Sequence, residues 1–577
     1  MRARENFTRK LETALDGIAE LNTLYGAPST SIGVLHHGRV LLSRSIGNRD
    51  GDPGHPADDS SVYLIGSLSK ALVAAAVGIL VDEGKLSWFD KVSEHLPGFD
   101  PIGDPSIARE ADFIDLLRHS SGLGNPVVRV IGPFGTIVSS EEKFMDLVNA
   151  TQTTNEHGNQ RFNREFEYSN INYAIVALVI ERITSLRFAD FVQKRLLDPL
   201  GMKQTLVTKR GVNSVHDMLI WSAAWLSAQS EERMSSACLD VLKGVAKNPL
   251  RQVDRIFKPA WQLSIEQRTN KPSTYCLGWL RSTMPTSDVN WGSLNKRTME
   301  DDTYLDYILG TESRERVMTK HTGIAYNTTS TMFLFPETNS AVIAMANGRR
   351  RGDASDFAAQ IMIQELFDLQ PYVDILARAK IETERGAVYR HNIVMAEWLK
   401  NRDVTGLERL KDYVGVYTTQ GTELHVNLDR KINRLVLHFN NRSDKPVHLE
   451  YYNKDTYCFF PTTIDEHFSK GFFDFDNYLV GLLQFTRDDA RSVSGLFWTW
   501  EIESKPIWYK REDILRARSP ETSPNISPKV GAGRTAPLMP NNVIVAKGIM
   551  ANNPKSGLLW SEVLKMSSTS AMRRVRA

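Results

Sequence analysis

A serine and a lysine three residues apart precede a strongly apolar segment, and this arrangement limits how the chain can fold. Ser67 and Lys70 are followed by residues 71–81, ALVAAAVGILV, which carry no charged side chain. A run of this length falls short of the ~20 residues that span a bilayer, and it is typical of a buried core helix. The sequence therefore predicts a helix that begins near Ser67 and carries a lysine amine into the interior.

That position would change the chemistry of Lys70. Residues three apart on a helix share one face, so the hydroxyl and the amine are expected to be neighbours. An unperturbed lysine has a pKa near ~10.4, and burial lowers it, so that a neutral amine can take the proton of a serine. Ser67 at the helix N-terminus also gains from the helix dipole, which favours developing negative charge.

Two further short motifs accompany this pair. Tyr168, Ser169 and Asn170 come directly before an apolar helical segment, and residues 321–323, His-Thr-Gly, come ahead of a predicted strand pair at 330–347. Each motif has a second copy in a less suitable setting. These copies are residues 140–143 (SEEK) in a charged stretch, residues 451–453 (YYN) among β-rich runs, and residues 555–557 (KSG) in the polar C-terminal tail.

The order Ser-x-x-Lys, Tyr-x-Asn, His-Thr-Gly resembles the serine β-lactamase and penicillin-binding-protein superfamily. The similar members are the class C β-lactamases, DD-peptidases and related esterases and acyltransferases. Three other segments carry the resemblance, which covers about residues 10–365: residues 82–90 (DEGKLSWFD), residues 116–123 (LLRHSSGL) and residues 275–279 (YCLGW), the last expected to be a strand.

The resemblance implies a role for each motif residue. Ser67 would be the nucleophile and Lys70 the general base for acylation. Tyr168 would share proton transfer, chiefly in deacylation and to the leaving group. Asn170 would hold a substrate carbonyl or orient Lys70. Each residue also has a structural interpretation, such as a helix cap for Ser67 and Asn170 or a core tyrosine for Tyr168.

The third motif would form the other wall of the site. Thr322 and Gly323 are expected at the substrate, and the backbone N–H groups of Ser67 and Ile324 would form the oxyanion hole. His321 replaces the lysine of many relatives and would give a weaker, pH-dependent charge, which argues against β-lactam or muropeptide substrates. His119 is interpreted as structural. The resemblance implies no cofactor and no metal.

The pattern of the remaining chain predicts an α+β protein. Helical spacing at 10–24, a hairpin at 29–43, the strand pair at 330–347 and helical spacing at 354–368 indicate a β-lactamase/transpeptidase-like antiparallel sheet with flanking helices and a helical subdomain. Eight β-rich runs between 413 and 511 predict a small antiparallel barrel. Its opening, residues 413–417 (YVGVY), resembles the lipocalin-like domain often attached to such hydrolases.

These patterns suggest four parts of the chain. They are a serine hydrolase domain at 1–365, a helical linker at 366–410, a lipocalin-like β-barrel at 411–512 and a mostly disordered tail at 513–577. The net charge of +2 predicts no nucleic-acid partner. Three cysteines are too few for a disulfide framework, and the N-terminus has no apolar signal segment. We therefore expect a cytoplasmic protein with no membrane span.

The predicted activity is that of a serine hydrolase that forms an acyl-enzyme with a small ester, amide or peptide. Two alternatives remain open. The same serine, lysine and tyrosine could serve an acyltransferase or peptide cyclase of a biosynthetic pathway, in which another nucleophile replaces water. A non-catalytic, ligand-binding relative is the other alternative, although the intact Ser67, Lys70 and Tyr168 argue against it. The sequence does not indicate an oligomeric state.

Overall fold

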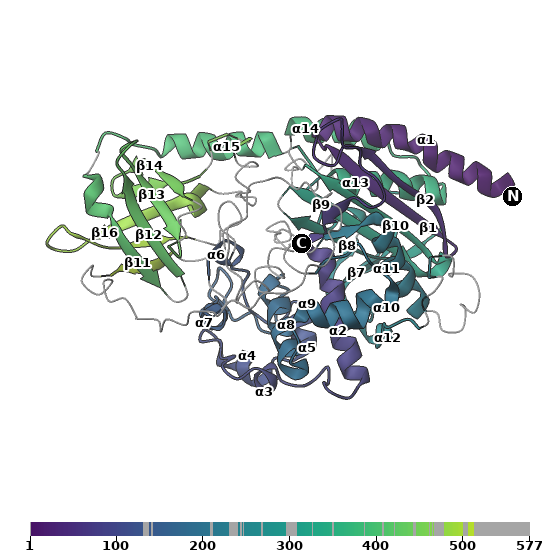
Figure 1. Ribbon diagram of the computed structural model, residues 1–577, viewed down its shortest axis with the longest axis horizontal. Coiled ribbons are helices and arrows are strands. Elements are labelled where there is room, and N and C mark those ends of the chain that lie inside the picture. Colours follow the sequence, from purple (N-terminus) through teal and green to yellow (C-terminus); the bar gives the residue numbers. More distant parts are fainter. Residues whose placement is uncertain are drawn as a thin grey trace, which may run out of the picture.

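The computed structural model describes residues 2–130, 138–139, 142–207, 212–229, 241–242, 245, 247–266, 269–295, 308–325, 327–348, 351–385, 387–406, 409–419, 422–441, 446–460, 462–463, 465–466, 478–499 and 506–512. Figure 1 shows a large body of helices around a sheet, and a smaller barrel beside it. The tail at 513–577, the copy of the first motif at Ser140 and the cysteine Cys238 lie outside the described residues.

The large body is built on an eight-stranded antiparallel sheet in the order β2-β1-β10-β9-β8-β7-β6-β5. Strands from the two ends of this part of the chain are neighbours near one edge of the sheet, because Ser29 of β1 lies opposite Asn347 of β10. The strands are β1 (Ser29–His36), β2 (Arg39–Gly47), β5 (Trp261–Glu266), β6 (Lys271–Tyr275), β7 (Leu280–Met284), β8 (Arg316–Ala325), β9 (Thr328–Phe335) and β10 (Ser340–Asn347).

Both faces of the sheet are covered, and the alternation of strand side chains divides the interior into two cores. Phe333 and Phe335 of β9 pack with α1 (Arg2–Tyr25) and α13 (Ala354–Phe367) on one face. Met332 and Leu334 point to the other face, toward α2 (Lys70–Asp82), α8 (Asn170–Thr184) and α11 (Val215–Ala228). Successive side chains of a strand point to opposite faces, so one strand contributes to both cores.

A helical subdomain extends from the second face. Its apolar residues join the same core as α2, which makes α2 the buried helix that the sequence predicts. The smaller elements of this region are β3 (Val62–Leu64), α3 (Val92–His95), α4 (Pro105–Glu110), α5 (Phe113–Leu117), α6 (Val127–Val130), α7 (Phe144–Asn149), α9 (Phe188–Val192), α10 (Asp198–Leu200), β4 (Val212–Ser214) and α12 (Val253–Ile256). The predicted α+β architecture with an antiparallel sheet is confirmed.

One local prediction in this region needs correction. Residues 275–279 do not form one strand. Tyr275 ends β6, and the next four residues turn into β7, with the Cys276 N–H donating to the Trp279 carbonyl over 2.7 Å. The His-Thr-Gly motif comes ahead of the predicted strand pair, now β9 and β10, and itself lies within a further strand, β8, which pairs with β9.

The barrel is closed by eight antiparallel strands, one from each predicted β-rich run. Their interior is filled by their own side chains, among them Tyr417, Tyr457 and Trp498, as is common in small barrels. Resemblance to the lipocalins remains a prediction. The strands are β11 (Gly415–Thr419), β12 (Thr422–Asp429), β13 (Arg434–Phe439), β14 (Val447–Asn453), β15 (Thr456–Cys458), β16 (Leu482–Arg487), β17 (Val493–Trp498) and β18 (Ile507–Arg511).

Two helices lie in the predicted linker. Ile375 of α14 (Ile375–Arg385) belongs to the core around α1, whereas Trp398 of α15 (Ala387–Lys400) belongs to the core of the barrel. The domain limits at 365, 410 and 512 remain predictions. In the part of the chain that the structure describes, no helix combines the length and the apolar character needed to cross a membrane.

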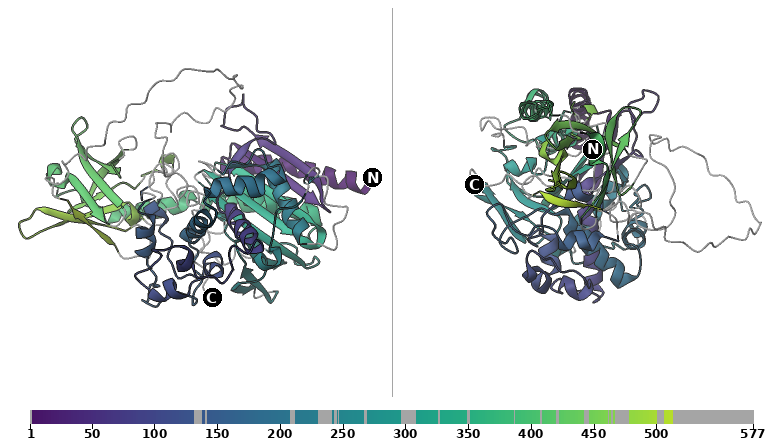
Figure 2. Two further views of the ribbon diagram at one scale, coloured as in Figure 1. Left: turned by 60° about the horizontal axis from the view of Figure 1, so that its bottom comes forward. Right: turned by 90° about the vertical axis from the view of Figure 1, so that its left-hand side faces the viewer.

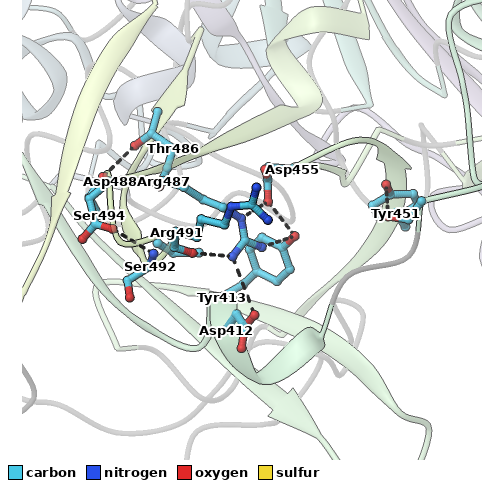
Figure 3. A network of polar contacts seen from close by, with 12 residues as sticks. Asp412, Tyr413, Tyr451, Asp455, Thr486, Arg487, Asp488, Arg491, Ser492 and Ser494 are labelled. Atoms are coloured by element: carbon cyan, nitrogen blue, oxygen red, sulfur yellow. Dashed lines mark hydrogen bonds and ion pairs between the residues drawn. The ribbon is translucent and has the colours of Figure 1, made fainter.

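A polar network closes one end of the barrel (Figure 3). Arg487 donates from Nε to Asp455 over 2.8 Å and from Nη2 to the Tyr413 hydroxyl over 3.1 Å. The Tyr413 hydroxyl donates in turn to Asp455 over 2.8 Å, and Asp412 lies 3.7 Å from Arg487 Nη1. These charge-assisted bonds tie the end of β16 to the turn between β14 and β15.

Removing the arginine is expected to weaken the barrel. Arg487→Ala should lower its free energy of unfolding by about 1–2 kcal/mol, because the half-buried Asp455 and the buried Tyr413 lose a charged donor. Urea titration followed by circular dichroism measures this loss. Arg430→Ala, at an exposed turn of the same barrel, is the matched control and should leave the midpoint unchanged. Equal midpoints for both variants would contradict the stabilising role of this network.

Candidate active site

Three separate elements bring the predicted site residues together. Ser67 lies in a 3-10 turn at Gly66–Ser69 that leads directly into α2, whose first residue is Lys70. Tyr168 precedes α8, and Asn170 is the first residue of that helix. The His-Thr-Gly motif runs along β8, which lies against the turn at Gly66–Ser69. All of these residues are buried, with Ser67 only 1% exposed.

The lysine amine joins the first two motifs. Lys70 Nζ lies 3.2 Å from Ser67 Oγ and donates to Asn170 Oδ1 over 3.0 Å. Burial lowers the pKa of Lys70 well below its ordinary value. A neutral amine has two N–H bonds and one lone pair. When one N–H is held by Asn170 Oδ1, the lone pair can be directed at the Ser67 hydroxyl. This geometry allows Lys70 to accept the serine proton.

Tyr168 borders the same amine with its ring. Lys70 Nζ lies 4.7 Å from the centre of the Tyr168 ring and 5.2 Å from that of Tyr173. The His119 ring packs on Tyr168 at a centroid distance of 4.2 Å. Tyr168 therefore lies between the lysine and a buried histidine.

His119 holds the chain on both sides of Tyr168. Its Nδ1 accepts a hydrogen bond from the Ser169 N–H over 3.1 Å, and its carbonyl accepts one from the Glu167 N–H over 2.9 Å. Burial, followed by the nearby Lys70, lowers the pKa of His119 well below its ordinary value, so the ring is neutral. The structural role of His119 is therefore to fix the position of Tyr168 through these contacts.

His321 is neutral as well, in contrast to the expected pH-dependent charge. Its Nδ1–H donates to the Thr322 carbonyl over 2.6 Å, so Nε2 accepts from the Tyr275 hydroxyl at 3.1 Å. Burial and the nearby Lys70 lower the pKa of His321 to about 3. The physical reason for the correction is complete desolvation, which disfavours the imidazolium. The Thr322 hydroxyl is buried and has no hydrogen-bond partner among the described residues.

The backbone of β8 approaches the nucleophile turn very closely. β7 pairs with β8 only as far as Lys320. Along residues 321–325, the same edge of β8 therefore faces the turn at Gly66–Ser69 in place of β7. A methyl group on Gly66 would lie 2.5 Å from Ile324 N, and one on Gly323 would lie 1.8 Å from the Ile65 carbonyl oxygen. Only glycine permits these approaches. They bring the backbone around Ser67 next to that of Ile324, as an oxyanion hole requires.

Sequence reasoning missed part of this environment. Tyr275 belongs to a motif that does not indicate its contacts. It orients His321, and with Trp291, Phe166 and Leu263 it forms an aromatic and aliphatic cluster around Tyr168. Asn125 belongs to no motif. Its Oδ1 accepts the Asn170 N–H over 3.0 Å. No local pattern marks such a residue, because the contact joins positions 45 apart in the sequence.

Among the described residues, one group at the surface has the spacing of metal ligands, formed by Asp90, Glu94 and His95. There His95 Nε2 already contacts Asp90 over 3.0 Å. Exposed acidic groups of this kind are common without a metal, and we assign it no role.

A helix-covered antiparallel sheet with a serine and a buried lysine at the head of one helix supports a function of the serine-hydrolase type. Residues 16–365 match the family described as Beta-lactamase, and the chain belongs to this family. The match covers more than half of the chain.

Among curated proteins, Protein flp of Staphylococcus aureus (strain MW2) is 27% identical over 213 residues, which are 37% of this chain and 41% of that protein. Penicillin-binding protein 4* of Bacillus subtilis (strain 168) is 28% identical over 209 residues, 36% of this chain and 43% of that protein. The chain thus spans about two fifths of the length of these relatives. A solved structure, the octameric penicillin-binding protein homologue from Pyrococcus abyssi, aligns over 86% of this chain and 99% of its own, with 15% identity and a TM-score of 0.47.

Proposed function

We propose that this protein is a serine hydrolase that forms an acyl-enzyme with a small, uncharged ester, amide or peptide. The observation that carries the proposal is the buried amine of Lys70, 3.2 Å from Ser67 Oγ. Burial lowers the pKa of Lys70 and so provides the neutral base that a serine nucleophile needs.

The proposed reaction has two steps. Ser67 Oγ attacks the substrate carbonyl while Lys70 takes the hydroxyl proton, and the N–H groups of Ser67 and Ile324 bind the oxyanion. The carbonyl bond to the leaving group then breaks, and that group receives a proton through Tyr168. A water molecule, deprotonated by the same lysine and tyrosine, attacks the acyl-enzyme and releases the acid and Ser67.

The charges around the site favour an uncharged acyl group. Burial lowers the pKa values of Lys70 and His321, which disfavours the cationic form of both side chains beside a substrate carboxylate. Lys320 lies one residue away, but it points to the opposite face of the sheet. There it donates to the Val289 carbonyl over 2.6 Å and lies over the Phe333 ring. A carboxylate beside the scissile carbonyl would lose its hydration without gaining a partner.

Acyl transfer to an amine or alcohol is a second candidate function. Ser67 is 1% exposed, and exclusion of bulk water is what an enzyme needs to protect an acyl-enzyme for another acceptor. The chemistry up to the acyl-enzyme is the same in both cases. The products formed with and without an added nucleophile distinguish them.

The experiment that tests the proposal combines a fluorophosphonate probe with p-nitrophenyl butyrate turnover. Intact-protein mass spectrometry should detect one adduct in the wild type and none in Ser67→Ala, and turnover should disappear with it. Ser60→Ala, in an exposed loop, is the control and should retain both. An adduct that persists in Ser67→Ala would refute the assignment and favour a non-catalytic, ligand-binding protein.

Because the contacts of His119 fix the position of Tyr168, we expect substitutions of His119 to lower turnover to different degrees. Asparagine tolerates the left-handed backbone of this position, where φ is 64°, and can offer an amide oxygen to the Ser169 N–H. His119→Asn should therefore retain most of the ester turnover. His119→Ala leaves that donor unpaired and Tyr168 loosely held, and should lower kcat by about 10²-fold.

Turnover at matched concentrations of folded protein, judged by thermal melting, checks this prediction. Equal kcat values for the asparagine and alanine variants would show that the acceptor at Nδ1 does not matter for Tyr168.

A further inference from the structure

One residue of the helical region is buried in the core of the barrel. Val138, between α6 and α7 in the chain, is 0% exposed and packs in the same cluster as the barrel residues Leu424 and Phe439. Figure 1 shows α6 on the side of the large body that faces the barrel, and in the left view of Figure 2 the barrel again lies beside the dark blue helical region. Through this insertion the helical region contributes a side chain to the core of the barrel.

Polar contacts fix Val138 from the side of the barrel. Its carbonyl accepts a hydrogen bond from Asn440 Nδ2, and the neighbouring Ser139 Oγ lies 3.4 Å from Thr422 Oγ1. Asn440 Oδ1 also accepts the Glu423 N–H over 3.1 Å. The side chain of Asn440 therefore joins the start of β12 to the end of β13, and it holds Val138 at the same time.

The other side of Val138 is joined to the helical region. Its N–H donates to the Val130 carbonyl over 2.9 Å, and Val130 ends α6 within the core around α2. The first residue of α6, Val127, donates to the Asn125 carbonyl over 2.8 Å. A short path of contacts thus leads from the barrel to Asn125.

This path ends at the candidate active site. The Asn125 side chain accepts the Asn170 N–H over 3.0 Å, and the Gly124 carbonyl accepts from Ser169 Oγ over 2.7 Å. The N-cap residue of α8, Ser169, makes no side-chain cap bond of its own. The first N–H groups of a helix lack partners within it, so Asn125 supplies this cap from outside. Asn170, which it holds, accepts from the Lys70 amine.

We propose that the C-terminal barrel is a positioning part of the active site. By holding Val138, Asn440 keeps α6 and Asn125 in the place from which Asn125 caps α8 and fixes Asn170 beside Lys70. Val138, Asn440 and Asn125 are positioning residues, since they act through Asn170 and not directly on the reacting atoms. This proposal rests on the proposed function, because its test measures labelling of Ser67 and ester turnover.

Asn440→Asp tests the proposal with a minimal change. Aspartate retains the acceptor for the Glu423 N–H and tolerates the left-handed backbone, where φ is 48°, but it replaces the donor to Val138 with a repelling oxygen. We expect the labelling rate of Ser67 with the fluorophosphonate and the kcat for p-nitrophenyl butyrate to fall about fivefold, in line with the loss of one hydrogen bond. KM and the melting temperature should change little.

Asn433→Asp is the matched control. It makes the same substitution at an exposed left-handed position of the same barrel, with φ of 50°, and should label at the wild-type rate. Coupling along the path is measured by a double-mutant cycle with Asn125→Ala. In that background, Asn440→Asp should have almost no further effect.

The outcomes separate this proposal from the proposed function. A wild-type protein that takes no label at Ser67 refutes the proposed function. A wild type that labels normally, with Asn440→Asp labelling at the same rate, refutes the positioning role of the barrel alone. Fully additive effects of Asn440→Asp and Asn125→Ala would also overturn it, because the two residues would then act independently.

Discussion

Replacing Lys70 with methionine is expected to lower kcat/KM for a neutral ester by about 10³-fold, the range in which a general base contributes. Methionine fills much of the same volume but has no lone pair basic enough to take the Ser67 proton. The measurement is p-nitrophenyl butyrate turnover together with the rate of fluorophosphonate labelling. Labelling should slow as much as turnover, because both depend on the same activated serine.

The same substitution should raise stability, which separates lost chemistry from lost folding. The pKa of Lys70 is lowered in the folded state, whereas the unfolded lysine has a value near ~10.4. Between these two values the unfolded chain binds the extra proton, so protonation favours unfolding as pH falls through this window. Lys70→Met removes that penalty. Its melting temperature at pH 7 should exceed that of the wild type, and the difference should shrink as the pH approaches ~10.4.

The pH profile of turnover identifies the titrating group. Activity requires neutral Lys70, so kcat/KM should fall as pH drops through the lowered pKa of this lysine. The pKa of His321 is about 3, and this ring stays neutral over the same range. His321→Gln should therefore leave the acid limb at the same pH even if turnover is reduced. A limb that disappears in His321→Gln would show that the histidine, not the lysine, is the titrating base.

The sequence predicted those features whose information is local. Each of the eight β-rich runs between 413 and 511 became a strand of the barrel, since alternation and turn residues act over a few positions. The helix after Ser67 followed from an unbroken apolar run. The first two motifs met as predicted, with Lys70 between Ser67 and Asn170.

What the sequence did not predict depends on contacts between distant segments. The charge of His321 could not be judged, because its pKa depends on how completely the folded protein excludes water from the ring. Asn125 and Val138 belong to no periodic pattern, and their partners Asn170 and Asn440 are far away in the chain. Residues 276–279 form a turn between β6 and β7 and do not continue the strand that ends at Tyr275, because apolar and aromatic residues favour a strand only when their backbone can pair.

Gly323 provides the other large expected effect, since it tests the close approach of β8 to the nucleophile turn. A methyl group added at this position would lie 1.8 Å from the Ile65 carbonyl oxygen and 2.5 Å from Ser330 Oγ. The first of these is a backbone atom that cannot rotate away. Ser330 Oγ donates to that same carbonyl over 2.8 Å, so the displacement would also break this bond.

Gly323→Ala is therefore expected to push β8 away from the turn at Gly66–Ser69 and to separate the N–H groups of Ser67 and Ile324. Loss of one oxyanion donor typically costs about 10²–10³-fold in kcat, and overpacking costs about 1–3 kcal/mol of stability. Ester turnover and thermal melting measure the two effects. Gly17→Ala is the matched control, because the added methyl there meets only Leu376 at 3.6 Å, an ordinary contact between α1 and α14. A folded Gly323→Ala protein with wild-type kcat would refute the proposed oxyanion hole, because Ile324 could not then have kept its place beside Ser67.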